Sequence, residues 1–241
     1  ERWRAASDAA HDRGAVFAIE IGHAGRRGAT RPRSEGLDRP LAAPWELIAP
    51  SPLAYGRRGP APREMTEDDM QRVGGDFAAA AKRAALARAD LLLVHMGHGY
   101  LIASFLSPLT NRRSDRFGGS LEARMTFPLE VLRSVREGWS DERPLGVVLT
   151  ATDWARGGLD VEDAVAVART LREHGCLLVL PVAGQTIRET RPRYGPAYLS
   201  PYAERIRTEA RVATIASGRI TTSGRANTIV GGGRADLVVI S

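Results

Sequence analysis

The sequence has a single cysteine, only one lysine and no long hydrophobic run. One cysteine, Cys176, cannot form an internal disulfide framework, and this scarcity is typical of proteins kept in a reducing cytoplasm. No apolar stretch approaches the roughly 20 residues that a membrane-spanning helix needs. We therefore expect a cytoplasmic protein with no membrane partner.

Acidic residues are also outnumbered, since 34 Lys and Arg face 28 Asp and Glu and give a net charge of +6. Apart from Lys82 the basic residues are all arginine, and they are scattered among the acids. No zinc-finger spacing, helix-turn-helix signature or aromatic-basic RNA motif accompanies them, so we predict no nucleic-acid partner. A basic surface suits a phosphorylated small molecule equally well.

Short apolar runs alternate with amphipathic stretches along the chain, which is typical of βα units around a parallel sheet in an α/β fold. The predicted strands are residues 16–21, 91–95, 146–150, 177–181, 212–216 and 237–240. The predicted helices run from 66 to about 89, from 120 to about 138, and over 161–173, 200–210 and 223–231. Residues 25–62 have no periodicity, and a loop of this length is usually functional or disordered.

Two histidines and a tyrosine, His95, His98 and Tyr100, directly follow the apolar run 91–94. At the end of a buried strand they place two hydrogen-bonding rings and a proton source at one edge of the sheet. This arrangement suits a site that binds a carbonyl oxygen and protonates a carbon. Packed strand-end side chains are the alternative. We predict no metal site, because no Cys, Asp or Glu nearby supplies a third ligand.

The stretch 94–101 and the following run 105–124 resemble the old yellow enzyme family of FMN-dependent ene-reductases. In that family two histidines hold the substrate carbonyl, and the tyrosine protonates the carbon opposite the hydride. The resemblance implies catalytic roles for His95, His98 and Tyr100, FMN as cofactor and NAD(P)H, either NADH or NADPH, as reductant. The predicted function is the reduction of an activated alkene or a dearomatised aromatic acyl-CoA ring.

The same resemblance implies a (β/α)8 TIM barrel, which has eight strands. The six predicted strands match strands three to eight of that barrel. We expect the first two strands to precede residue 1, and the last helix to follow residue 241. Residues 1–241 are then a single FMN-binding TIM-barrel-type domain, incomplete by itself, within a longer barrel or a fusion protein.

Residues 20–27 resemble the family's QLxHAGR signature, which implies flavin contacts for Glu20 and His23. Glu20 stands where the family has a glutamine beside the flavin pyrimidine ring, and an ionised carboxylate cannot donate a hydrogen bond. Val148 stands where the family usually has an arginine near the flavin, and it supplies no charge. These two departures keep an alternative open, namely a flavin-free, non-catalytic barrel fragment or scaffold domain.

Two further ligand contacts are predicted. Ser217, Gly218 and Arg219 follow the predicted strand 212–216, and in the family this loop helps to bind the FMN phosphate. Arg26 and the neighbouring Arg27 are candidates for binding the anionic groups of a ligand, Arg26 those of the substrate, with exposure to water as the alternative.

Residues 182–186 and 191–202 are similar to the reductase part of fused flavoproteins that act on aromatic acyl-CoA esters, of the 2-aminobenzoyl-CoA monooxygenase/reductase and salicylyl-CoA 5-hydroxylase type. This similarity implies a fused monooxygenase domain before residue 1 and contacts between CoA phosphates and Arg191 and Arg193. Open edges of a six-stranded sheet favour contacts with other chains, so a homo-oligomer is a further expectation.

Overall fold

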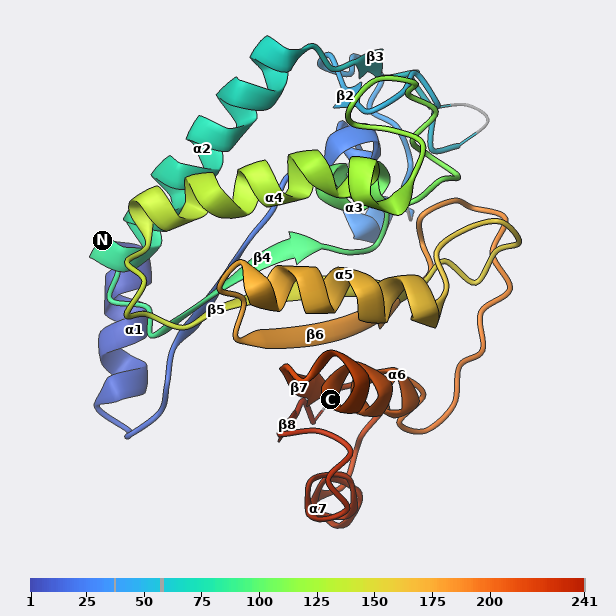
Figure 1. Cartoon of the computed structure of the whole chain (residues 1–241). Coiled ribbons are helices and arrows are strands. Elements are labelled where there is room, and N and C mark those ends of the chain that lie inside the picture. Colours follow the sequence, from blue (N-terminus) through green and yellow to red (C-terminus); the bar gives the residue numbers. More distant parts are fainter. Residues whose placement is uncertain (37, 57–58, 241) are drawn as a thin grey trace.

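The computed structural model describes residues 1–36, 38–56 and 59–240. At its centre is a curled sheet of six parallel strands in the order β1-β4-β5-β6-β7-β8 (Figure 1). These strands are β1 (Ala18–Ile21), β4 (Leu91–Met96), β5 (Leu145–Thr152), β6 (Leu178–Ala183), β7 (Ala213–Ala216) and β8 (Leu237–Val238). The helices are α1 (Arg2–His11), α2 (Glu67–Leu86), α3 (Leu101–Leu106), α4 (Leu121–Gly138), α5 (Val161–Glu173), α6 (Ser200–Arg205) and α7 (Ser223–Gly231). All six predicted strands are therefore present, although the last is shorter than predicted.

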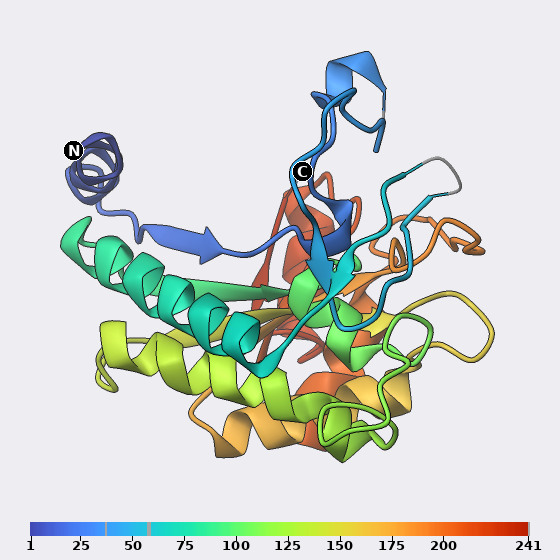
Figure 2. The ribbon, with the colours of Figure 1, turned by 90° about the horizontal axis from the view of Figure 1, so that it is seen from above.

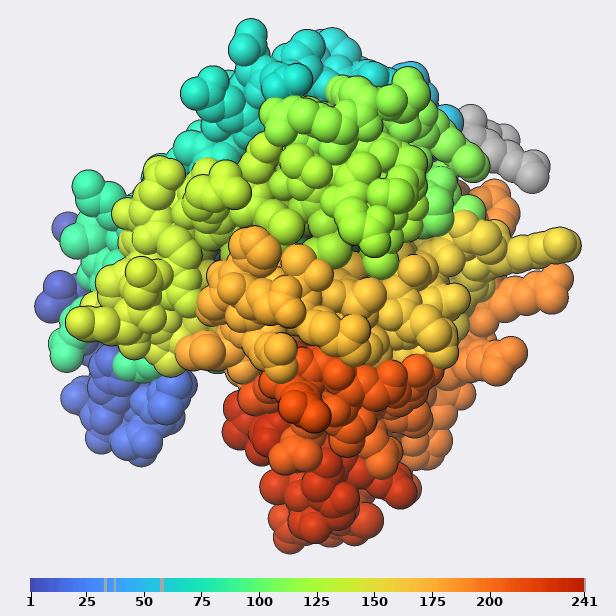
Figure 3. Space-filling view, in the orientation of Figure 1, coloured from blue at the N-terminus to red at the C-terminus, as the bar shows by residue number. Residues whose placement is uncertain are grey.

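The sheet is a half-barrel and not a closed (β/α)8 barrel. Among the described residues, β1 pairs only with β4, and β8 pairs only with β7, so both outer strands are edges. Figures 2 and 3 show α1, which precedes β1, well apart from the C-terminal elements. A closed barrel of this type needs eight strands with matching tilt and stagger, and six strands leave the circle open.

The two faces of the sheet have different surroundings. On β4, Leu92, Val94 and Met96 belong to the main core, together with the buried faces of α2, α4 and α5. Leu93 points to the concave face, where it packs with Val148. Side chains alternate between the faces of a strand, so the same concave face receives every second residue of each strand.

Capping explains where the long helices begin. The Thr66 hydroxyl accepts from the Asp69 N–H, and the Asp69 carboxylate accepts from the Thr66 N–H, which forms a capping box at the start of α2. Asp160 and Asp163 repeat the arrangement at the start of α5. The predicted ends of α4, α5 and α7 are confirmed, whereas α2 stops at Leu86, before the predicted end near residue 89.

Several elements were missed or differ from the prediction. Most residues of α1 are exposed, so it has little apolar periodicity, whereas α3 is buried on all sides and has no polar face. The predicted helix 200–210 is α-helical only to Arg205 and continues as a π-helical turn, Ile206–Ala210. The long loop contains the short strand β2 (Ile48–Ala49), which pairs in parallel with β3 (Arg63–Glu64).

None of the helices in the described ranges combines the length and the apolar character required to cross a membrane.

Candidate active site

The predicted catalytic residues meet at the C-terminal edge of the sheet. His95 lies near the end of β4, and His98 and Tyr100 lie in the turn before α3. The centroid of the His95 ring is 5.4 Å from that of His98 and 4.9 Å from that of Tyr100. Glu20 on β1 pairs in register with Leu93 on β4, so it points to the same concave face. The four side chains therefore form one group, as expected at the ligand-binding edge of a parallel sheet.

A tight turn gives the two histidines their positions. His98 has a left-handed backbone (φ 55°), and its N–H donates to the Thr150 hydroxyl on β5 at 3.1 Å. The next residue, Gly99, is also left-handed (φ 67°), and a Cβ there would lie 2.6 Å from the Thr186 Cα. Only glycine fits this position without displacing the neighbouring loop. The turn is thus fixed from two adjacent strands.

Glu20 determines how His95 presents its second ring nitrogen. The Glu20 carboxylate forms a short hydrogen bond with Nδ1 of His95, and this bond holds the pKa of the carboxyl below its usual range. The His95 side chain is only 9% exposed, and Nε2 has no hydrogen-bond partner among the described residues. A neutral His95 that donates from Nδ1 to Glu20 therefore has a lone pair at Nε2, and only the imidazolium has a proton there.

The surroundings of His98 keep its ring uncharged. Burial, assisted by the positive charges of His95 and Arg27, lowers the pKa of His98 to about 4. His98 is consequently a neutral imidazole at neutral pH, able to donate from one nitrogen and accept at the other. Within the described residues, no three His, Cys, Asp or Glu side chains are grouped as metal ligands.

Arg27, for which the sequence left open binding of a ligand anion or exposure to water, connects this group to a neighbouring cavity. Its guanidinium lies over the rings of Tyr55 and Tyr100, at 4.4 and 5.3 Å from the centroids. It donates to the His98 carbonyl at 2.6 Å and pairs with Asp38 at 2.8 Å. The cavity has a volume of about 700 Å³, and Arg27 and Tyr55 are among its lining residues. Arginine in a QLxHAGR-like block was the available signal.

Arg26, predicted to bind a substrate anion, lines the same cavity but uses its donors within the protein. It donates to the carbonyls of Leu53 (2.9 Å), Ala54 (3.3 Å) and Thr186. Only 5% of the residue is exposed, and this burial lowers the pKa of the guanidinium to about 10. In this structure Arg26 joins the loop after β1 to the loop after β6.

Sequence reasoning gave no role to Asp153. It follows β5, it is fully buried, and it accepts hydrogen bonds from the hydroxyls of Ser107 (2.6 Å) and Thr186 and from the Leu159 N–H (2.8 Å). Burial raises the pKa of this carboxyl despite those donors. Asp153 thereby connects three loops beneath the active edge, and an acid directly after an apolar strand was the signal for it.

Two predicted cofactor contacts, Val148 and His23, lie on different sides of the sheet. Val148 is buried on the concave face beside His95, its register partner on β4. Nδ1 of His23 accepts from the Gly25 N–H at 3.0 Å. Burial lowers the pKa of His23, and the charges of Asp76 and Arg72 on α2 act on the same ring. His23 therefore lies on the α2 side and outside the group formed by His95 and its neighbours.

The predicted phosphate loop follows β7. Gly218 is left-handed (φ 92°), and a Cβ there would lie 2.8 Å from the ring of Tyr198. Ser217 is partly exposed and Arg219 is exposed, so both are accessible to a ligand. Such a turn exposes backbone N–H groups, which suits a phosphate.

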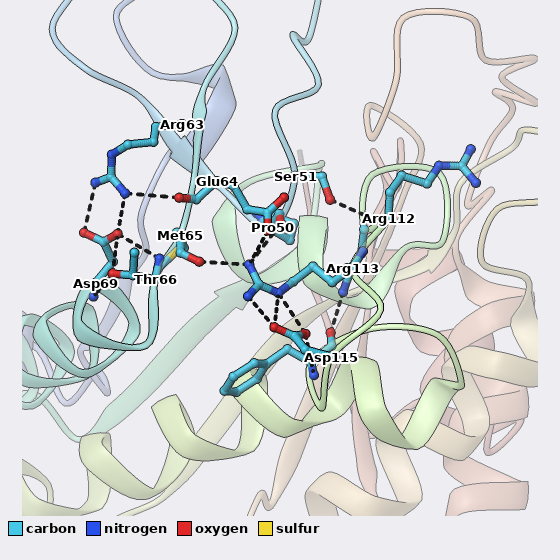
Figure 4. Close-up of polar contacts among 12 residues, drawn as sticks. Pro50, Ser51, Arg63, Glu64, Met65, Thr66, Asp69, Arg112, Arg113 and Asp115 are labelled. Atoms are coloured by element: carbon cyan, nitrogen blue, oxygen red, sulfur yellow. Dashed lines mark hydrogen bonds and ion pairs between the residues drawn. The ribbon is translucent and has the colours of Figure 1, made fainter.

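The loop that follows α3 has a structural role, as Figure 4 shows. Arg113 donates to the Met65 carbonyl at 2.8 Å and to the Pro50 carbonyl at 3.3 Å. It also pairs with Asp115 at 2.5 Å and with Glu64 at 3.3 Å. We define this set of residues as the Arg113 cluster. It attaches the β2–β3 ribbon to the loop, and each nitrogen of the Arg113 guanidinium donates to a partner within the protein.

Comparison with known proteins agrees with this geometry. All 241 residues match the NADH:flavin oxidoreductase / NADH oxidase family. The NADPH dehydrogenase of Geobacillus thermodenitrificans is 40% identical over 229 residues, which is 95% of this chain and 63% of that protein. The NADPH dehydrogenase of Listeria welshimeri is 36% identical over 233 residues, which is 97% of this chain and 64% of that protein. The chain thus spans slightly less than two thirds of the length of these relatives.

Solved structures of reductases are also similar to this chain. A 2-naphthoyl-CoA reductase in complex with 2-naphthoyl-CoA superposes with a TM-score of 0.84 at 26% identity, covering 98% of this chain and 37% of that one. Morphinone reductase in complex with tetrahydroNAD superposes with a TM-score of 0.70 at 28% identity, covering 98% of this chain and 64% of that one. The names of the family and of these relatives include a flavin, NADH and NADPH, in agreement with the predicted FMN and NAD(P)H. The chain therefore belongs to the NADH:flavin oxidoreductase / NADH oxidase family, the family of old yellow enzyme.

Proposed function

We propose that this chain supplies the substrate-binding and proton-donating edge of an FMN-dependent NAD(P)H oxidoreductase of the ene-reductase type. The observation that carries this proposal is the buried Nε2 of His95, which has no hydrogen-bond partner among the described residues and lies next to His98 and Tyr100. A buried polar atom without a partner is costly in a folded protein. A ligand oxygen at this position would remove that cost.

The residues present fit a flavin on the concave face. Ser217, Gly218 and Arg219 would hold the phosphate, and Glu20 and Val148 would face the ring system. When bound, FMN supplies hydride chemistry, taking a hydride from NAD(P)H and releasing it to carbon. Glu20 stands where the family has a glutamine, and its carboxylate is engaged in a hydrogen bond with His95.

The chain's own residues polarise the substrate. Neutral His98 donates one N–H to the carbonyl oxygen, and imidazolium His95, stabilised by Glu20, donates from Nε2 to the same oxygen. Both bonds strengthen as negative charge develops on that oxygen, and this difference lowers the barrier. Tyr100 transfers its hydroxyl proton to the carbon next to the carbonyl carbon, while the hydride is added at the β-carbon.

The finer substrate assignment is an aromatic acyl-CoA ester. It is supported by the resemblance of residues 182–202 to fused acyl-CoA flavoproteins and by the structural similarity to a 2-naphthoyl-CoA reductase. We extend the same proposal to a fused monooxygenase domain, to assembly with further copies through the open edges of β1 and β8, and to a cytoplasmic location.

The first test is the visible spectrum of the purified chain after mixing with FMN and desalting. Retained bands near the flavin maxima, at roughly 370 and 450 nm, support the proposal. Glu20→Gln and Val148→Arg, which restore the family's residues, serve as matched comparisons. A spectrum without these bands in the wild type and in both variants contradicts the proposal and favours the second candidate, a flavin-free scaffold, to which the uncharged Val148 points.

A further inference from the structure

A second cavity, of about 300 Å³, opens at the C-terminal end of β5. Its lining residues are Thr152, Trp154, Ala155, Arg156, Arg191, Arg193 and Tyr202. We call it the arginine cavity. The loops after β5 and β6 that form it lie side by side in Figures 1 and 2, on the same edge of the sheet as His95. This edge is where parallel sheets bind their ligands.

One wall of the arginine cavity is aromatic and firmly held. The indole N–H of Trp154 donates to the Tyr202 hydroxyl at 3.2 Å. The Arg191 N–H donates to the Trp154 carbonyl at 2.9 Å, which connects the two loops directly. Tyr194 packs edge-on against Trp154, with 5.4 Å between the ring centroids. A fixed aromatic face of this kind suits stacking with a planar base.

The charge of the arginine cavity is positive and uncompensated. Of the described residues that line it, three are arginines and none is acidic. Within residues 1–36, 38–56 and 59–240, Arg156, Arg191 and Arg193 form no ion pair. Nearby Arg205, in contrast, pairs with two glutamates at 2.7 and 2.6 Å. Three guanidinium groups around one cavity repel one another unless an anion lies between them.

We propose that the arginine cavity binds the phosphorylated adenosine end of a nucleotide ligand, with phosphates on Arg156, Arg191 and Arg193 and the base against Trp154. The planar guanidinium binds phosphate through paired hydrogen bonds, which an ammonium group cannot do. A phospho-ADP group has three phosphates, one for each arginine. This assignment rests on the proposed function, in which CoA esters and NADPH both have such a group.

The test is calorimetric titration of the full chain with CoA, dephospho-CoA, NADP⁺ and NAD⁺, without FMN or reductant. The variant is the double substitution Arg191→Gln/Arg193→Gln. Its matched control is Arg133→Gln/Arg225→Gln, which removes the same charge from exposed positions on α4 and α7. We expect the first pair to weaken nucleotide binding by about tenfold or more, and the control pair by less than about twofold. Thermal melting checks that both variants are folded.

The ligand pairs identify the source of the phosphates. If removing the phosphate lowers the affinity more from CoA to dephospho-CoA than from NADP⁺ to NAD⁺, the cavity binds the acyl-CoA substrate. If it lowers the affinity more from NADP⁺ to NAD⁺, the cavity binds the reductant. Equal weakening in both double variants, or no binding of either phosphorylated nucleotide at about 1 mM, overturns the assignment. Because no flavin takes part, CoA binding can succeed where FMN retention fails, so the two proposals fail independently.

Discussion

Arg113 donates to two backbone carbonyls and pairs with two carboxylates, whereas His95, buried to a similar degree, leaves Nε2 without a partner among the described residues. Both regions pair basic side chains with carboxylates from distant segments of the chain. The difference is in saturation, since the Arg113 cluster satisfies its groups internally and the active edge does not. Saturated polar groups stabilise loops, while an unsatisfied, oriented group is available to a ligand.

The largest expected effect tests the active edge. Tyr100→Phe removes the hydroxyl proton but keeps the ring beside His95. We expect the reduction of a simple cyclic enone to slow by about 10²- to 10⁴-fold, the usual range for losing a general acid. Stopped-flow measurements of the two half-reactions check this, and the reduction of bound FMN by NADPH is the internal control. Equal slowing of both half-reactions would contradict the assigned role.

The next largest expected effect tests the Arg113 cluster. Arg113→Ala leaves two backbone carbonyls and two carboxylates without their partner, and the Arg113 side chain is only 8% exposed. We expect the free energy of unfolding to fall by about 3 kcal/mol. Arg112→Ala is the matched control, because only its backbone N–H takes part, donating to Ser51, and we expect a loss below about 0.5 kcal/mol. Similar losses in the two variants would remove the distinction.

A smaller effect tests how Glu20 acts through His95. With Glu20 as acceptor, the His95 ring is held by Nδ1 so that Nε2 faces the substrate. Glu20→Ala removes this hydrogen bond, whereas the amide oxygen of Glu20→Gln can keep it. We expect KM for a simple cyclic enone to rise about tenfold in Glu20→Ala and by less than about threefold in Glu20→Gln, as steady-state kinetics would show. An unchanged KM in Glu20→Ala would exclude this positioning role.

The smallest effect concerns acid stability near the Arg113 cluster. Hydrogen bonds from Arg63 and Thr66, which Figure 4 shows, and from Arg72 hold the pKa of Asp69 far below its usual range. A lowered folded-state pKa means that this stabilisation is present above the unfolded value, about 4, and is lost as pH falls. Asp69→Asn should lower the free energy of unfolding by about 1 kcal/mol at pH 7 and by less at pH 3, as urea titrations would show. Exposed Asp68→Asn is the control and should show little dependence.

Local sequence predicted the elements that depend on local chemistry. The six strands are short apolar runs, and α2 and α5 begin at capping boxes that can be recognised in the sequence. The fully buried α3 escaped prediction because it has no polar face, and α1 escaped because most of its residues are exposed and Ser7 is its buried residue. The end of α2 was placed late for a similar reason, since helix ends depend on weak local preferences.

The candidate site shows the same division. Sequence by itself determined that His95, His98 and Tyr100 meet, because spacing along one strand and its turn fixes their separation. Only the tertiary structure decided that Glu20 binds His95, that Arg26 joins two loops, and that His23 lies on the α2 side. These outcomes depend on which strands become neighbours and on which donors are already occupied. Contacts of that kind are set by packing between distant segments, which local sequence patterns do not specify.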